Sequence, residues 1–322
     1  MSVDFESALA PYLLDFLKFK NALGIKYQTG SYYLKSLDRF NLANGNNENL
    51  KQDIVEAWVR QTELSSKSQD RSFLPPIREF GRYLVSIGFD NAYILSDNYK
   101  MQRYRANVYL MTENEIASFF RTCDIEVSNS LSVGRPYVLP ALYRFLYACG
   151  VRCGEARSLK CVNVHLDDNY IDIIKTKSHR DRRLFLSAEL TGYFKKYEKK
   201  IAICFPEREY FFPNPMGGCY SSCAISSNFR KIWLSAGLSR SGDVKPRAYD
   251  FRHHFGCANI IRWTKDGLDA HAMLPYLMRY MGHTSLESTY HYLHLIPDFF
   301  PQYSMLASST EKLIPEVEEY EV

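Results

Sequence analysis

The sequence predicts a mainly α-helical protein with two domains, the second of which also contains a small antiparallel sheet. At 322 residues the chain exceeds what one hydrophobic core usually supports, so two cores are expected. Apolar residues recur at helical spacing over most of the chain, whereas Tyr170–Ile174 and Arg182–Leu186 alternate as strands do. We therefore expect a helical N-terminal domain at residues 1–105 and a mixed, mostly helical domain at residues 106–322.

The first domain is predicted to consist of four helices. They are expected at Phe5–Leu23, Thr29–Leu42, Gln52–Thr62 and Lys67–Ile87. Gly24 and Gly88 follow the first and the last of these segments, where a glycine commonly ends a helix. Basic side chains lie on the polar faces and in the polar stretch that follows. Among them, Arg71, Arg78, Arg103 and Arg105 are candidate contacts to a DNA backbone.

The second domain begins with a helix-capping signal at Thr112, which Glu115 completes three residues later. A long apolar helix at Pro136–Cys149 comes next, and Gly150 is suited to the left-handed turn that ends it. The two alternating segments form a β-hairpin with Lys177 at or near its tip. Further helices are expected at Ala188–Ile203, Cys223–Ala236, Ala248–Trp263 and Leu274–Met281.

Composition narrows the possible classes of function. No apolar run reaches the roughly 20 residues of a membrane span, and Asp4 and Glu6 stand where a secretory signal needs positive charge. The eight cysteines lack paired zinc-site spacing, so we expect reduced thiols in a cytoplasm and no metal site. No phosphate-binding glycine loop occurs, which argues against nucleotide hydrolysis. The net charge of +4 is small, but lysines and arginines cluster while acids collect at the C-terminus.

Five residues spread over about half the chain carry the chemistry. They are Arg152, Lys177, Arg252, His283 and, nine residues later, Tyr292. The cations and the histidine can neutralise a pentacovalent phosphate, Lys177 or His283 can move protons, and Tyr292 offers a phenolic nucleophile. This combination predicts attack of a tyrosine on a phosphodiester, and a phosphodiester in a polymer indicates nucleic acid.

The segments around these residues resemble the signatures of the tyrosine recombinases, the phage integrase family. Gly150–Leu159 resembles the pattern G-[LMV]-R-x-x-E-x-x-x-L, and Thr176–Arg182 is similar to the hairpin that carries the family's catalytic lysine. Tyr249–Phe255 resembles the H-D-L-R-H-T-F box, Gly282–Ser285 the L-G-H-x-S box, and Ser288–His294 the T-T-x-x-Y-x-H box. These matches in the family's order make coincidence improbable.

The resemblance implies catalytic roles for the five residues, with Lys175 as a competing candidate for the lysine. The spacing of nine residues selects Tyr292 over Tyr290 as the nucleophile. Two further residues are expected to support catalysis. Glu155 should orient the cations, and Tyr249 stands where the family usually has histidine, so it can donate a hydrogen bond but cannot act as a cationic acid. Lys175, Arg180 and Arg182 join the candidate DNA contacts.

What the resemblance implies for activity is site-specific recombination through a 3′-phosphotyrosyl intermediate. It needs no cofactor and no small-molecule substrate, since the ester stores the bond energy. The expected partners are duplex DNA, clamped by a core-binding domain and a catalytic domain, and further copies of the chain, with a tetramer on paired sites and a monomer or dimer when free. We expect no membrane contact and a cytoplasmic, nucleoid-associated protein.

Several alternatives remain at the level of sequence. Integration or transposition of a mobile element is favoured over resolution of chromosome or plasmid dimers by the same chemistry. A type IB topoisomerase and a catalytically idle DNA-binding accessory protein are the other candidates. The tail at Ser308–Val322 is predicted to form a short amphipathic helix that docks on a neighbouring subunit, or else folds back over its own active site.

Overall fold

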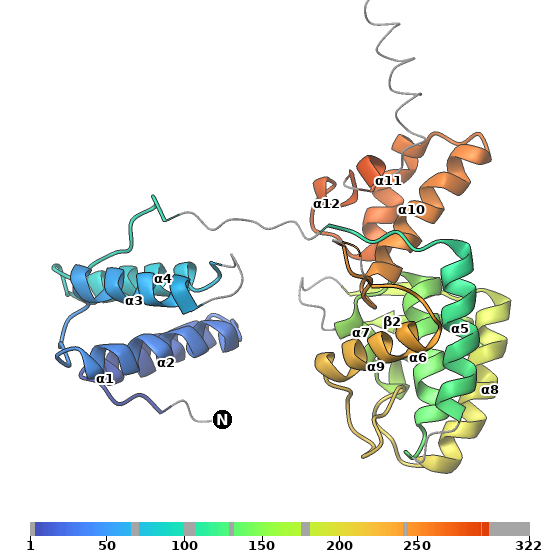
Figure 1. Cartoon of the computed structure of the whole chain (residues 1–322), viewed down its shortest axis with the longest axis horizontal. Coiled ribbons are helices and arrows are strands. Elements are labelled where there is room, and N and C mark those ends of the chain that lie inside the picture. The colour runs from blue at the N-terminus through green and yellow to red at the C-terminus, as the bar shows by residue number, and fades with distance from the viewer. Residues whose placement is uncertain are drawn as a thin grey trace, which may run out of the picture. The chain divides into compact units, whose positions relative to one another are not determined.

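The computed structural model describes residues 4–65, 71–99, 107–128, 132–174, 181–240, 242, 244–290 and 292–295. The chain divides into two compact units, residues 1–106 and residues 107–322. Figure 1 shows that the first unit is built from helices and that the second combines helices with a small sheet. The predicted mainly helical fold with a small antiparallel sheet is confirmed.

The first unit contains helices α1 (Ala10–Ala22), α2 (Gln28–Ala43), α3 (Gln52–Ser65) and α4 (Leu74–Ser86). Helices α1 and α4 begin later than the apolar periodicity predicted. Each has a proline in its first turn, where the missing N–H breaks no helical hydrogen bond, so proline marks the beginning of the helix. The core of this unit gathers around the buried side chains of Phe16, Trp58 and Phe80.

A buried carboxylate holds the segment that precedes α1 in the first unit. Asp38 on α2 is 1% exposed and accepts hydrogen bonds from the backbone N–H groups of Glu6 and Ser7 at 2.7 and 3.1 Å. It also accepts one from the Ser7 hydroxyl at 2.6 Å. These bonds hold the segment before α1 against α2.

The second unit is a helical assembly with a three-stranded sheet at one side. Its helices are α5 (Glu113–Ser128), α6 (Arg135–Cys149), α7 (Cys153–Arg157), α8 (Ala188–Cys204), α9 (Ser222–Ser235), α10 (Asp250–Lys265), α11 (Ala270–Met281) and α12 (Glu287–Tyr290). Short 3₁₀ turns lie at Cys161–Asn163 and Leu293–Leu295. The strands β1 (Val164–His165), β2 (Tyr170–Ile173) and β3 (Arg182–Phe185) pair antiparallel in the order β1-β2-β3.

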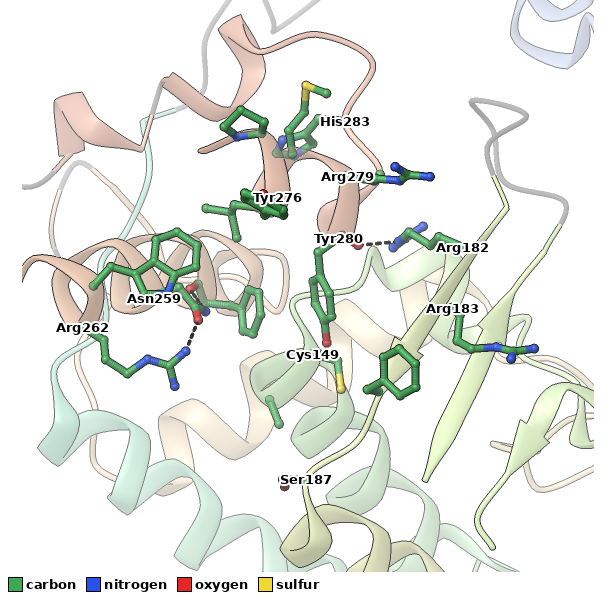
Figure 2. A pocket seen from close by; sticks show the side chains of 18 of the residues that line it. Cys149, Arg182, Arg183, Ser187, Asn259, Arg262, Tyr276, Arg279, Tyr280 and His283 are labelled. Atoms are coloured by element: carbon green, nitrogen blue, oxygen red, sulfur yellow. Dashed lines mark hydrogen bonds between the residues drawn. The ribbon is translucent and has the colours of Figure 1, made fainter. Parts of the chain in front are cut away.

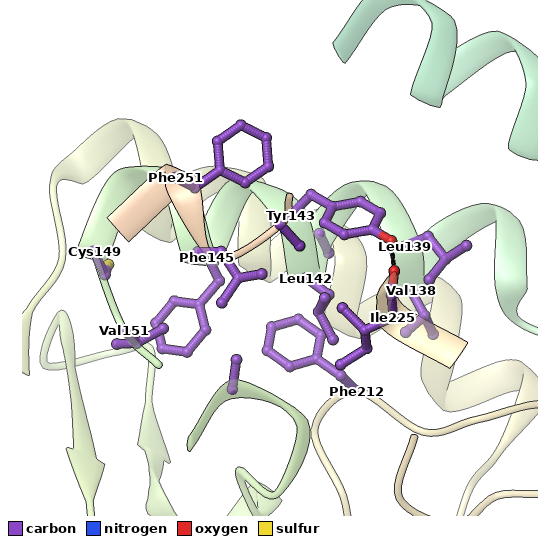
Figure 3. Close-up of a cluster of buried hydrophobic side chains, with 14 of the residues drawn as sticks. Val138, Leu139, Leu142, Tyr143, Phe145, Cys149, Val151, Phe212, Ile225 and Phe251 are labelled. Atoms are coloured by element: carbon purple, nitrogen blue, oxygen red, sulfur yellow. Dashed lines mark hydrogen bonds between the residues drawn. The ribbon is translucent and has the colours of Figure 1, made fainter. Parts of the chain in front are cut away.

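The core of the second unit is organised around α6, which packs against α5, α8 and α10. Figure 3 shows Tyr143 and Phe145 of α6 among side chains from the surrounding elements, including Phe251 of α10. The Tyr143 hydroxyl donates to the Ile225 carbonyl at 2.8 Å, so its one polar atom is satisfied inside the core. This packing fixes the beginning of α10, where one of the predicted catalytic arginines lies.

A smaller apolar cluster joins α10 to α11. It contains Ile260, Leu274, Leu277 and Met281, and it also includes Tyr292 from the segment after α12. The ring of the predicted nucleophile is therefore part of a packed core. Across the described part of the chain, none of the helices is both long and apolar enough to traverse a membrane.

Candidate active site

Three arginines from distant parts of the sequence converge on the carboxyl end of helix α11. The last carbonyl groups of a helix have no partner within the helix, so they accept hydrogen bonds from outside it. The Tyr280 carbonyl accepts from Arg182 Nε, the Met281 carbonyl from Arg252 Nη2 and the Gly282 carbonyl from Arg152 Nη2, each at 2.6 Å. The negative end of the helix dipole favours cations at this place.

Gly282 makes this convergence possible. It ends α11 with φ of +67°, in the left-handed region that favours glycine. A Cβ atom at this position would lie 2.8 Å from Nη1 of Arg182. Glycine is therefore required both by the backbone turn and by the space that the guanidinium occupies.

Arg152 is presented by the short helix α7. It is the N-cap residue, and its backbone N–H donates to Glu155 Oε2 at 3.0 Å while its Nη1 donates to Glu155 Oε1 at 2.7 Å. Burial alone would raise the pKa of Glu155, but Arg182 and Arg152 outweigh that effect and hold the pKa at about 2. Glu155 is thus ionised at neutral pH, and the predicted orienting role has a structural basis.

Arg252 is the most deeply buried of the three arginines, with 1% exposure. It lies in the first turn of α10, and its Nη1 donates to the Gly150 carbonyl at 2.6 Å in addition to the bond to Met281. Burial lowers the pKa of Arg252, while the proximity of Tyr292 opposes that shift. A guanidinium in this place is a fixed positive charge with a set orientation.

His283 directly follows Gly282 and is 8% exposed. Its Nδ1 lies 2.9 Å from the hydroxyl oxygen of Thr289, a residue that is completely buried. Burial, together with the positive charges of Arg252 and Arg152, lowers the pKa of His283 to about 3. The imidazole is therefore neutral at pH 7 in the site without DNA, and it acts there as a hydrogen-bonding group.

Tyr292 lies between two imidazoles. Its ring centroid is 5.9 Å from that of His283, with the rings nearly parallel, and 5.6 Å from that of His253. Burial raises the pKa of Tyr292 to about 12, although the charge of Arg252 opposes the rise. The phenol is 2% exposed and protonated at neutral pH.

Tyr249 stands at the beginning of α10 as its N-cap residue. Its ring packs edge-on against His253 at a centroid distance of 5.1 Å, and 41% of the residue is exposed. The rings of Tyr249, His253 and Tyr292 therefore contact one another in a row, in that order. His253 thus contacts both tyrosines through its ring.

The remaining predicted residues fall into two groups. Arg71 forms an ion pair with Glu63 at 3.1 Å, and Arg78 donates to the carbonyls of Leu95, Ser96 and Tyr99, so both have partners inside the first unit. Their contact with DNA stays a prediction. Five predicted residues and the tail lie outside the described residues: Arg103, Arg105, Lys175, Lys177, Arg180 and Ser308–Val322.

Two residues that matter to the site were missed by sequence reasoning. Thr289 orients the imidazole of His283, and Gly256 on α10 faces the Tyr292 ring so closely that a Cβ atom would lie 2.9 Å from it. The threonine belongs to the same box as Tyr292, and that membership was the available signal. No pattern in the sequence marks Gly256, because its role depends on a residue 36 positions later.

Comparison with known proteins agrees with this geometry. The sequence profile of the phage integrase family matches residues 110–297. A putative integrase/recombinase, y4rB of Sinorhizobium fredii, is 24% identical over 293 residues, which are 89% of this chain and 93% of the relative. The Tn1549 transposon integrase in complex with transposon right end DNA has 12% identity and a TM-score of 0.63, covering 96% of this chain and 99% of that one. A lambda integrase tetramer bound to a Holliday junction has 15% identity and a TM-score of 0.62, covering 90% and 78%.

The fold and the family profile define the class, a DNA strand transferase of the tyrosine recombinase type. The chain belongs to the phage integrase family, because the profile covers more than half of it. The resemblance seen in the sequence motifs is confirmed, and so is site-specific recombination as the activity.

Proposed function

We propose that Tyr292 is the nucleophile of this recombinase and that Arg152, Arg252 and His283 bind the scissile phosphate. The observation that carries the proposal is the position of the Tyr292 ring, which packs against His283 and lies beside Arg252. Arg252 in turn binds the carboxyl end of α11, where the other arginines also bind. In the step, the phenolic oxygen forms a bond to phosphorus and the bond to the 5′ oxygen breaks. The phenol loses its proton and the departing oxygen gains one.

The environment of the site without DNA disfavours ionisation of the Tyr292 phenol and protonation of the His283 imidazole. The pKa of Tyr292 is about 12 and that of His283 about 3. Moving the proton from the phenol to the imidazole is therefore strongly unfavourable in the site without DNA. A phosphate diester placed between the arginines raises the pKa of His283 and aligns the phenol, so cleavage is tied to correct binding.

The sequence supplies the proton donor for the leaving group. We propose Lys177 for this role, with Lys175 as the alternative, because both lysines lie a few residues before Arg182, the first residue of β3, in the sequence. An amine protonates a departing alkoxide without a metal ion or nucleotide. The product is a 3′-phosphotyrosyl ester, and reversal by a 5′ hydroxyl of a second strand completes the exchange.

A nicked suicide duplex tests this assignment. The duplex carries the junction sequence at the boundary of the element that encodes the protein, and the adduct is detected as a protein band of reduced mobility in a denaturing gel. Tyr292→Phe should abolish the adduct, whereas the matched control Tyr290→Phe, 40% exposed and two residues away, should retain it. An adduct with Tyr292→Phe would show that another residue attacks, and no adduct with the wild type would favour an idle accessory protein.

The first unit is proposed to be the core-binding half of a clamp around duplex DNA. A transposon integrase of the same fold is solved with transposon DNA, and a lambda integrase is solved as a tetramer on a Holliday junction, which supports DNA and further copies of the chain as partners. We propose integration or transposition of a mobile element at the nucleoid, with dimer resolution as the alternative. Amplifying circular element junctions from cells that express the protein distinguishes these roles.

The acidic tail is proposed to dock in trans on a neighbouring subunit. A cavity of about 1460 Å³ lies between α10, α11, β3 and the beginning of α8, and four arginines and one aspartate contribute to its wall (Figure 2). The exposed rings of Phe185 and Tyr276 add apolar surface. Residues 311–322 offer five glutamates against one lysine, with apolar residues between them, which complements this wall.

Deleting the chain from Ser309 onward tests the docking. The truncated protein should still bind a single site as a monomer but should fail to assemble a tetramer on paired sites, as followed by native gel electrophoresis. Tyr276→Ala should show the same defect with the tail in place. Tetramers that form unchanged in the truncated protein would refute docking in trans and favour a tail that folds over its own active site.

A further inference from the structure

The side chain of Arg182 is turned into the protein. It opens β3, its side chain is 7% exposed, and its guanidinium meets two different elements. Nη1 and Nη2 donate to the two carboxylate oxygens of Glu155 at 3.1 and 2.7 Å, and Nε donates to the Tyr280 carbonyl at 2.6 Å. Figure 2 shows the bond to Tyr280 at the end of α11. A side chain engaged on three sides and closed to solvent is poorly placed to contact a DNA backbone.

We propose that Arg182 is a positioning residue for recombination, which holds the phosphate-binding groups in register. It does so through Glu155 on one side and through the end of α11 on the other. The inference rests on the proposed function, because the groups that it places are Arg152 and His283.

The link to Arg152 passes through one shared carboxylate. Glu155 Oε1 accepts from both Arg152 Nη1 and Arg182 Nη1, and Oε2 accepts from the Arg152 backbone N–H and from Arg182 Nη2. The Glu155 side chain is 8% exposed, so an unbalanced charge there is costly. Removing Arg182 leaves Arg152 as the one counter-charge that the described residues give to Glu155, and the carboxylate is then free to pull the Arg152 fork away from the phosphate position.

The link to His283 passes through the backbone. Tyr280, whose carbonyl Arg182 binds, is three residues before His283, and Gly282 lies between them against the Arg182 guanidinium. The His283 N–H in turn donates to the Met278 carbonyl at 3.0 Å. Arg182 therefore supports the turn from which the imidazole projects. One side chain on β3 ties together the segments that hold an arginine and the histidine.

The neighbouring residue in β3 shows how specific this placement is. Arg183 points to the other face of the sheet, is half exposed, and binds the Asp172 carboxylate with two nitrogens at 2.9 and 3.0 Å. Its guanidinium also stacks on the Tyr170 ring at 3.7 Å. Strand alternation separates two adjacent arginines, one directed to the site and one directed to solvent.

The test separates positioning from DNA contact. In Arg182→Gln, the dissociation constant for the duplex should stay within about twofold, because no phosphate contact is lost. Single-turnover formation of the adduct at saturating DNA should fall by roughly 100-fold, as expected for catalytic groups displaced by about 1 Å. Arg182→Lys keeps the charge but not the fork, so it should recover only a small part of the rate.

Two variants control for a general loss of folding. Arg208, 4% exposed, forms an ion pair with Glu198 on α8, so Arg208→Gln removes a comparably buried arginine from an ion pair away from the site. It should lower the melting temperature similarly yet cleave at the wild-type rate. If Arg182→Gln does not fold, the double variant Glu155→Gln with Arg182→Gln removes the unbalanced charge, and it should fold and still cleave slowly.

Two results would overturn the inference. The first is wild-type adduct formation by Arg182→Gln or by the double variant at saturating DNA. The second is weaker DNA binding with a shallower salt dependence and an unchanged cleavage rate, which identifies a phosphate contact. Tyr292→Phe in the same assay tests the proposed function separately. An adduct formed by Tyr292→Phe would contradict the assignment of Tyr292 as the nucleophile, but it would not bear on the role of Arg182.

Discussion

Replacing Gly256 by alanine is expected to displace Tyr292, the proposed nucleophile, without unfolding the protein. A Cβ atom at this position on α10 would lie 2.9 Å from Cδ2 and Cε2 of Tyr292 and 3.1 Å from its Cγ. Carbon atoms in contact prefer about 3.5 to 4.0 Å, so the ring has to move by roughly 0.6 to 1 Å. A shift of about 1 Å in a reacting group can lower the rate by about 100-fold.

The assay is single-turnover adduct formation with the nicked duplex at saturating concentration, alongside a binding titration and a thermal melt. Binding should be unchanged, and the melting temperature should change little, because alanine is better in a helix than glycine by about 1 kcal/mol and offsets part of the crowding. The matched control is Gly192→Ala on α8, where a Cβ atom meets nothing within 4 Å. If Gly256→Ala cleaves as fast as Gly192→Ala, the packed position of Tyr292 is not the one from which it reacts, and the argument fails.

Three further outcomes follow from the same structure. Gly282→Ala should slow cleavage strongly and destabilise the fold by about 1 to 2 kcal/mol, because φ at this position is +67° and the new Cβ would lie 2.8 Å from Arg182. Cleavage at the wild-type rate together with an unchanged melting temperature would contradict this expectation. Acid should destabilise the protein, because the pKa values of His283 (about 3 against 6.5) and Glu155 (about 2 against 4.5) lie below their ordinary values, so the unfolded chain binds more protons. The melting temperature should therefore fall between about pH 6.5 and 3 because of His283, and between about pH 4.5 and 2 because of Glu155. A melting temperature that does not change over these ranges would contradict the lowered pKa values. Asp38→Ala should lower the unfolding free energy of the first unit by about 2 to 3 kcal/mol in a denaturant titration, while Asp38→Asn should lose less, since the amide oxygen still accepts.

Local signals were sufficient for the elements and for the order of the functional boxes. The capping box of Thr112 and Glu115 is present, with the Thr112 hydroxyl accepting from the Glu115 N–H at 3.3 Å and the Glu115 carboxylate accepting from the Thr112 N–H at 2.8 Å. The hairpin strands pair where the alternation predicted them. The beginnings of α1 and α4 were predicted less accurately, because the apolar periodicity extends beyond the residues whose backbone is helical. The prolines of α1 and α4 decided those beginnings.

The orientation of Arg182 marks the limit of residue-by-residue reasoning about the site. Its basic character and its place in the hairpin suggested a DNA contact. Yet it shares a strand face with Leu184, which is completely buried, and that alternation was the signal for an inward direction. The partner that makes such burial favourable, Glu155, is 27 residues away, so only the three-dimensional structure could identify it. The same holds for Gly256 and the ring that it accommodates.

The end of α11 also bears on how such enzymes can be re-engineered. Because Arg152, Arg182 and Arg252 each bind one of the last carbonyl groups of α11, the geometry of the cationic centre depends on where that helix ends. Inserting or deleting a single residue in that helix would rotate the terminal carbonyls by roughly 100° and offer them to the wrong arginines, so grafts meant to retarget the enzyme should leave α11 intact.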